Sequence, residues 1–149
     1  MTLFVKSATT NQIEILLGSS EIYNCSLSVL NVTGDLVHLQ YGSLPANQPH
    51  DNKNFVAIWN TSVIPWNTPP LRQVRIPQNS QDGTVIIDDL SITKTSYIVG
   101  YSVGAVVTNT CCTALIAAGG MRLPPNAITI AIESIGTNSI GVYYQTLAG

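Results

Sequence analysis

The chain has 149 residues, of which 45% are hydrophobic and only 9% are charged, and its formal net charge is −2. This length fits one domain, residues 1–149, with its own core. The few basic residues are scattered apart from Arg72 and Arg75, which argues against nucleic acid as a partner because phosphate contacts need clustered Lys and Arg. No stretch approaches the roughly 18–20 continuous apolar residues that cross a membrane, so we expect no transmembrane segment.

Neutral polar residues take the place of the missing charges. Ser, Thr and Asn together make up about 40 residues, and they hydrogen-bond with water or a ligand without creating a long-range field. The N-terminal segment 1–12 lacks the basic leader, apolar run and small-residue cleavage site of a secretory signal. The localisation therefore stays open: the protein is cytoplasmic, it is exported by a non-classical route, or the sequence is that of an already mature chain.

Short apolar runs rich in Val, Ile, Thr and Tyr recur along the chain, and turn signals such as Asp82-Gly83 and Pro124-Pro125 separate them. A spacing of about ten residues from run to run is typical of a sandwich or barrel. No window carries the apolar stripe of a helix. The predicted strands are, in chain order, 3–6, 12–17, 23–32, 36–41, 54–59, 71–76, 84–90, 96–103, 105–108, 112–117, 127–134 and 139–146.

Alternating apolar and polar residues predict half-buried antiparallel strands. In one strand Val37, Leu39 and Tyr41 would face the core while the residues between them face outward. The segment 96–103 is apolar on both faces for most of its length and predicts a central strand, and the segment 127–146 predicts a β-hairpin. These features predict an all-β domain built as an antiparallel Greek-key β-sandwich.

The segment Asp89-Leu90-Ser91-Ile92 followed by Tyr97-Ile98-Val99 resembles the corner of immunoglobulin-like and fibronectin-type sandwiches. In that corner a Tyr near the start of a strand hydrogen-bonds to the backbone upstream. The spacing from Leu90 to Tyr97 is one residue longer than the pattern. The resemblance implies immunoglobulin- or fibronectin-like features of the architecture, and it carries no function.

The motif Gly100-Tyr-Ser-Val-Gly104 matches G-x-S-x-G, in which Ser102 would be the nucleophile of a hydrolase. That motif needs a helix after the Ser and a His later in the chain. Both histidines, His38 and His50, precede Ser102, and the β-branched residues after the motif disfavour a helix. Redox catalysis would need a C-x-x-C motif, which is absent. We therefore expect no enzymatic activity.

The loop 48–54 concentrates His50, Asp51, Asn52 and Asn54, and the Asp and Asn side chains could offer oxygen ligands to Ca²⁺. It lacks the Gly and the closing Glu of an EF-hand loop. We expect no cofactor, with a loop calcium as the alternative.

The three cysteines, Cys25, Cys111 and Cys112, leave at least one thiol without a partner in the chain. A disulfide from Cys25 to either of the others could tie two strands in an oxidising compartment. Three buried thiols acting as small apolar side chains are favoured in a chain without a visible signal.

The segment 59–70 is the strongest candidate for a binding site, because it holds both tryptophans, each followed by Asn and Thr, in a proline-rich loop. An exposed aromatic ring can stack on a sugar while amides and hydroxyls bond its OH groups, and neither contact needs charge. Alternatively, Trp59 is a core residue at a strand end and Trp66 covers the sandwich edge. The candidate ligand-binding residues are Trp59, Asn60, Trp66 and Asn67, helped by Asp51, Asn52 and Asn54 from the preceding loop.

Two functions fit these observations. The first is a non-catalytic, lectin-like carbohydrate-binding protein that recognises a neutral glycan. The alternative is a self-assembling structural protein, such as a coat, fibre or inclusion component, because low charge and exposed strand edges favour association. Both predict a homo-oligomer.

Overall fold

The computed structural model describes residues 22–93, 96–117, 126–127 and 129–147. Within these ranges the chain forms antiparallel strands and one short 3-10 helix, η2 (Val107–Asn109), with no α-helix. The prediction of an all-β fold with antiparallel sheets is confirmed. No helix in this part of the chain is long and apolar enough to cross a membrane. The predicted strands 3–6 and 12–17 lie outside the described residues.

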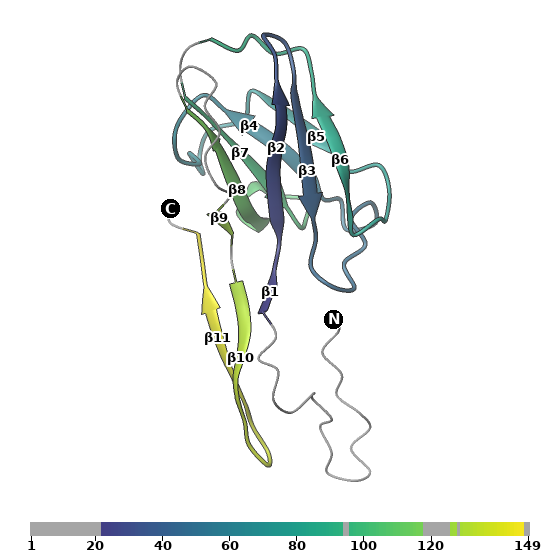
Figure 1. Cartoon of the computed structure of the whole chain (residues 1–149), viewed down its shortest axis with the longest axis vertical. Helices are drawn as coiled ribbons and strands as arrows, with labels where there is room; N and C mark the ends of the chain where they lie inside the picture. Colours follow the sequence, from purple (N-terminus) through teal and green to yellow (C-terminus); the bar gives the residue numbers. More distant parts are fainter. Residues whose placement is uncertain (1–21, 94–95, 118–125, 128, 148–149) are drawn as a thin grey trace.

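The strands pair into three sheets, with orders β2-β3-β6, β5-β4-β7-β8-β9 and β1-β10-β11. Figure 1 shows the first two sheets as two layers and the third extending away from them. The strands are β1 (Ile22–Asn24), β2 (Ser26–Val32), β3 (Val37–Gly42), β4 (Phe55–Trp59), β5 (Arg72–Arg75), β6 (Asp82–Ile87), β7 (Tyr97–Ser102), β8 (Thr110–Ile116), β9 (Asn126–Ala127), β10 (Thr129–Ile135) and β11 (Ile140–Gln145).

The structure divides one predicted strand and removes another. The segment 23–32 is two strands that meet at Cys25, because β1 pairs with β10 while β2 pairs with β3. The strand predicted at 105–108 is wrong, since the chain turns there into η2. The hydroxyl oxygen of Ser102 lies 3.0 Å from the carbonyl oxygens of both Gly104 and Val106 and holds this turn.

The predicted central strand and hairpin are confirmed. β7 lies between β4 and β8, and all its residues are buried. β10 and β11 pair antiparallel, with an irregularity in register between Ile132 and Ser134.

The sheets β2-β3-β6 and β5-β4-β7-β8-β9 share one hydrophobic core. Alternate residues of β3 are buried, as predicted: Val37, Leu39 and Tyr41. They belong to the same cluster as Val99 and Tyr101 of β7. A smaller cluster contains Phe55, Ala57, Trp59, Ile64 and Ile98. Residues of β4 and β7 alternate between the two clusters, so these strands are covered on both faces and their sequences are apolar throughout.

Two tyrosines join the layers within the main core. The rings of Tyr41 and Tyr101 lie 5.3 Å apart between centroids, with 31° between their planes, a favourable tilted arrangement. The Tyr41 hydroxyl donates to the carbonyl of Ser80 at 3.1 Å, and the Tyr101 hydroxyl accepts from Asn54 Nδ2 at 2.7 Å. Burial is the main cause that raises the pKa of Tyr101 to about 12.

Tyr97 makes the upstream hydrogen bond that its sequence predicts. Its hydroxyl donates to the carbonyl of Ser91 at 3.3 Å and accepts from the backbone N–H of Thr93 at 3.0 Å. These bonds hold Ser91 and Thr93, which follow β6, against the start of β7.

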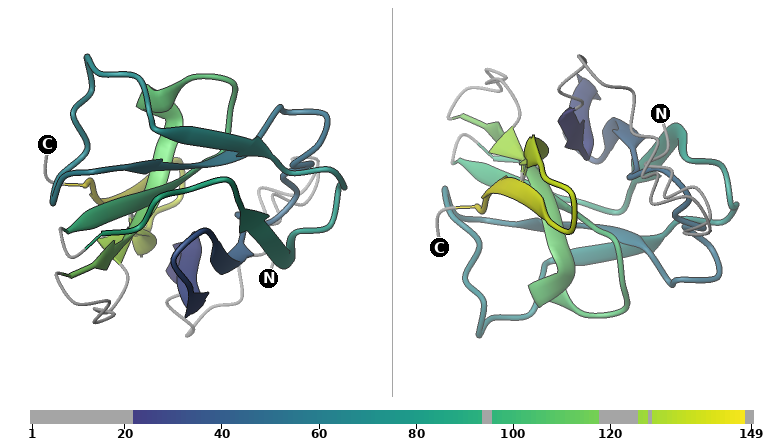
Figure 2. Two further views of the ribbon diagram at one scale, coloured as in Figure 1. Left: turned by 90° about the horizontal axis from the view of Figure 1, so that it is seen from above. Right: turned by 90° about the horizontal axis from the view of Figure 1, so that it is seen from below.

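The sheet β1-β10-β11, which we call the arm, leaves the two layers at their lower end (Figure 1). β1 is followed directly by β2 of one layer, and β10 follows closely after β9, the last strand of the other layer. Figure 2 shows the same arrangement from the two ends of the molecule.

Two leucines of β2 provide a test of the layer assignment. Leu27 is 0% exposed and Leu30 is 38% exposed. We expect Leu27→Ala to lower the free energy of unfolding by about 2–5 kcal/mol, because it removes buried contacts and leaves a cavity. Leu30→Ala should cost less than about 1 kcal/mol. Urea denaturation of both variants measures the difference, and equal losses would contradict the assignment.

Candidate functional site

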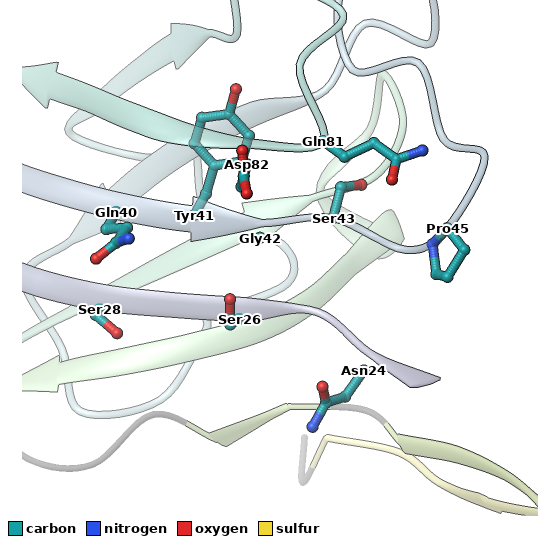
Figure 3. Close-up of a pocket in the computed structure, with 10 residues that line it drawn as sticks. All are labelled: Asn24, Ser26, Ser28, Gln40, Tyr41, Gly42, Ser43, Pro45, Gln81 and Asp82. Carbon is teal, nitrogen blue, oxygen red and sulfur yellow. The ribbon is translucent and has the colours of Figure 1, made fainter. Parts of the chain in front are cut away.

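An open polar cleft lies on the outer face of β2 and β3, near the ends that lead into β1 and the β3–β4 connection (Figure 3). Its volume is about 580 Å³, which is within the roughly 300–1,000 Å³ usual for small-molecule sites. The residues around it are Asn24, Ser26, Ser28, Gln40, Tyr41, Gly42, Ser43, Pro45, Gln81 and Asp82.

The strand register explains why the surface is hollow here. Gly42 of β3 pairs with Ser26 of β2 on one side and with Asp82 of β6 on the other, and directly paired residues point to the same face of a sheet. Ser26, Gly42 and Asp82 therefore form a row across the three strands, and its middle residue, Gly42, has no side chain. A Cβ atom at residue 42 would collide with the Ser26 hydroxyl, so the glycine keeps the floor of the cleft open.

The chemistry of the lining is polar and almost neutral. Serine hydroxyls come from Ser26, Ser28 and Ser43, and carboxamides come from Asn24, Gln40 and Gln81. Asp82 supplies the one carboxylate, and the lining contains no Lys, Arg or His. Such a surface offers many donors and acceptors but no positive charge for an anion.

Hydrogen bonds between two connections hold one end of the cleft. The backbone N–H of Ser43 donates to the carbonyl of Gln81 at 2.6 Å. Farther along the same connections, Asp51 N–H donates to Asn79 Oδ1 at 3.1 Å, and Asn79 Nδ2 donates back to Asp51 Oδ2 at 3.0 Å. The β3–β4 and β5–β6 connections are thereby fixed to each other.

The two tryptophans have different environments. Trp59 is 2% exposed and packs in the smaller core cluster, and its Nε1 donates to the carbonyl of Thr68 at 3.0 Å. Trp66 is 37% exposed, and Asn60 and Asn67 of the same loop are also exposed. Trp59 therefore occupies the core position that was the alternative interpretation, and the tryptophans do not present two exposed rings.

The three candidate ligand-binding residues from the preceding loop also differ in burial. Asp51 and Asn52 are exposed, whereas Asn54 is 0% exposed and donates from Nδ2 to the Tyr101 hydroxyl. This loop leads into the first residue of β4, and the tryptophan loop follows its last residue. The seven predicted residues thus lie toward opposite ends of β4 and do not converge on one surface.

The cleft was not predicted from the sequence because its lining comes from separate stretches, 24–28, 40–45 and 81–82, without a motif. The available signal was the outward set of polar residues on two predicted strands, with a glycine beside it.

The structure does not support the other chemistries that the sequence suggested. Ser102 is 0% exposed, and its hydroxyl is engaged by backbone carbonyls. Among the described residues, no group of three or more His, Cys, Asp and Glu side chains could hold a metal ion.

The three cysteines are free thiols buried in the core. Their exposed fractions are 1% for Cys25 and 0% for Cys111 and Cys112, as the sequence favoured. The pKa of Cys25 is lowered, chiefly by its hydrogen bond with Cys111 and to a smaller extent by the one with Cys112. The pKa of Cys112 is raised, chiefly by burial.

No protein-family model matches this chain, and neither the curated proteins nor the solved structures contain a match to it.

Burial of the cysteines predicts slow thiol chemistry. We expect an aromatic disulfide reagent to leave the native protein unlabelled at neutral pH and to titrate all three thiols after denaturation, because Cys25, Cys111 and Cys112 are shielded from solvent. Absorbance of the released thiolate measures the number. Rapid labelling of the native protein would contradict the burial.

Proposed function

We propose that this protein is a self-assembling structural protein whose arm associates with a second copy of the chain. The supporting observation is the exposure of β11. Val142, Tyr143 and Tyr144 are consecutive in the strand, and their exposed fractions are 50%, 51% and 70%. Because successive side chains point to opposite faces, β11 presents apolar surface to solvent on both faces. Such contiguous surface is typical of a contact site.

The position of β11 in its sheet supports the same proposal. It is the last strand in the order β1-β10-β11, so one of its edges has no strand partner within the described residues. Open edges carry backbone donors and acceptors that can pair with another chain. Pairing at this edge would bring the exposed side chains of two copies together.

The low charge favours a second copy as the occupant. The segment 129–147 contains one charged residue, Glu133, and the whole chain has a net charge of −2. Little electrostatic repulsion therefore opposes contact between identical arms. Two identical edge strands can pair antiparallel around a two-fold axis, and a two-fold dimer is the commonest homo-oligomer.

We also propose that the body of the protein is a Greek-key β-sandwich with immunoglobulin-like features. From β2 onward, the orders β2-β3-β6 and β5-β4-β7-β8 place the first, second and fifth strands in one sheet and the fourth, third, sixth and seventh in the other. That connectivity and the hydrogen bonds of Tyr97 are similar to those of immunoglobulin-like domains.

Replacement of one apolar residue of β11 tests the assembly. We expect the wild-type protein to sediment as an oligomer that dissociates on dilution. Val142→Asp should raise the dissociation constant at least tenfold, because association would bury an unpaired carboxylate. Sedimentation velocity over a range of protein concentrations measures the change.

Val63→Asp is the matched control, because Val63 is 59% exposed and lies in the β4–β5 connection. It should leave the oligomer intact. A wild-type chain that stays monomeric at every concentration would contradict the proposal, as would equal dissociation of both variants.

A further inference from the structure

We propose that the polar cleft on β2 and β3 binds a neutral saccharide. This proposal does not depend on assembly through β11. The sequence predicted carbohydrate binding in the tryptophan loop, whereas this proposal places it in the cleft.

The nature of the floor excludes one common mode of recognition. Gly42 lies in β3, the middle strand of its sheet, and pairs on both sides. Backbone groups of a middle strand are already used, so an incoming peptide cannot add a strand at this floor. Recognition depends instead on side chains that project from the face.

The lining side chains favour ligands with several hydroxyl groups. Serine hydroxyls and carboxamides both donate and accept hydrogen bonds, and the carboxylate of Asp82 accepts them. Each hydroxyl of a sugar can also donate and accept. An apolar ligand would leave these groups unpaired at a cost in affinity, and an anionic ligand would face Asp82 with no cation in the lining.

Several lining groups are placed to act together. Ser28 of β2 pairs with Gln40 of β3, and the next row is Ser26, Gly42 and Asp82. Figure 3 shows Ser26, Ser28 and Gln40 along the neighbouring strands, with Ser43 and Gln81 toward the adjoining connections. Polar groups at this spacing surround an open floor and can contact different hydroxyls of one ring.

Titration of the protein, residues 1–149, with neutral oligosaccharides tests the site. The probes are maltotriose, cellotriose, mannotriose and N,N′,N″-triacetylchitotriose, and the measurements are calorimetry and amide chemical shifts. We expect at least one probe to bind and to shift the amides of residues 26–28, 40–43 and 81–82. Gln40→Ala should weaken that binding at least tenfold, and Gly42→Val should abolish it by filling the floor.

Gln73→Ala is the matched control, because Gln73 is also an exposed strand glutamine but lies in β5. It should bind like the wild type. The proposal is overturned if none of the four probes binds or if Gln40→Ala binds with unchanged affinity. Loss of binding in Trp66→Ala but not in Gln40→Ala would assign the site to the tryptophan loop and would also overturn it. The wild-type chain is titrated in whatever oligomeric state it adopts. A failure to bind any saccharide would therefore leave the proposal of assembly through the arm unaffected.

Discussion

The contact between Tyr41 and Tyr101 holds together the two layers of this molecule, one of which carries the cleft. It joins β3 to β7, and therefore one layer to the other, across a ring separation of 5.3 Å. A buried Tyr needs a partner for its hydroxyl. Tyr41 reaches the carbonyl of Ser80 in the β5–β6 connection, and Tyr101 reaches Asn54 at the start of β4. The core is thus tied to the connections that border the cleft.

A glycine on the neighbouring strand makes room for Tyr41. A Cβ atom at Gly83 would lie 2.9 Å from the Tyr41 hydroxyl, so the start of β6 can lie this close to the Tyr41 ring only with glycine there. Gly42 has the corresponding role on the outer face, where it leaves space beside Ser26. Two glycines on neighbouring strands therefore serve different purposes: one lets the core tyrosine reach its acceptor, and the other keeps the outer surface open.

The arm is less dependent on the core than the cleft is. Its sheet consists of β1, β10 and β11, and β11 exposes Val142, Tyr143 and Tyr144. Burial of such side chains contributes about 25 cal/mol per Å² of apolar surface removed from water, and this stabilisation is available only from contact with another surface. With 9% charged residues in the chain, the electrostatic barrier to that contact is low.

Much of the fold could be predicted from local sequence. The alternation at Val37, Leu39 and Tyr41 gave the correct buried face of β3, and the apolar run 96–103 gave the central strand. The turn at 105–108 was missed because its β-branched residues resemble a strand, whereas its hydrogen bonds, among them those of Ser102 and the one from Asn109 N–H to the Val106 carbonyl, are not encoded in a local pattern.

The candidate site was less accessible to sequence reasoning. Tryptophan is equally suited to a core and to a sugar platform, so the burial of Trp59 depends on how its loop folds back to Thr68. The cleft depends on which residues face each other across β2, β3 and β6, a property of register that no short motif encodes. Exposure on β11 likewise depends on what the rest of the chain leaves uncovered.

Hydrogen–deuterium exchange at high and low protein concentration can show whether the arm mediates assembly. We expect the amides of β11, residues 140–145, to exchange more slowly in the concentrated sample, while those of β6, an edge strand of the body, exchange at the same rate in both. Exchange of β11 that does not depend on concentration, or slowing confined to β6, would mean that the arm is not the contact site.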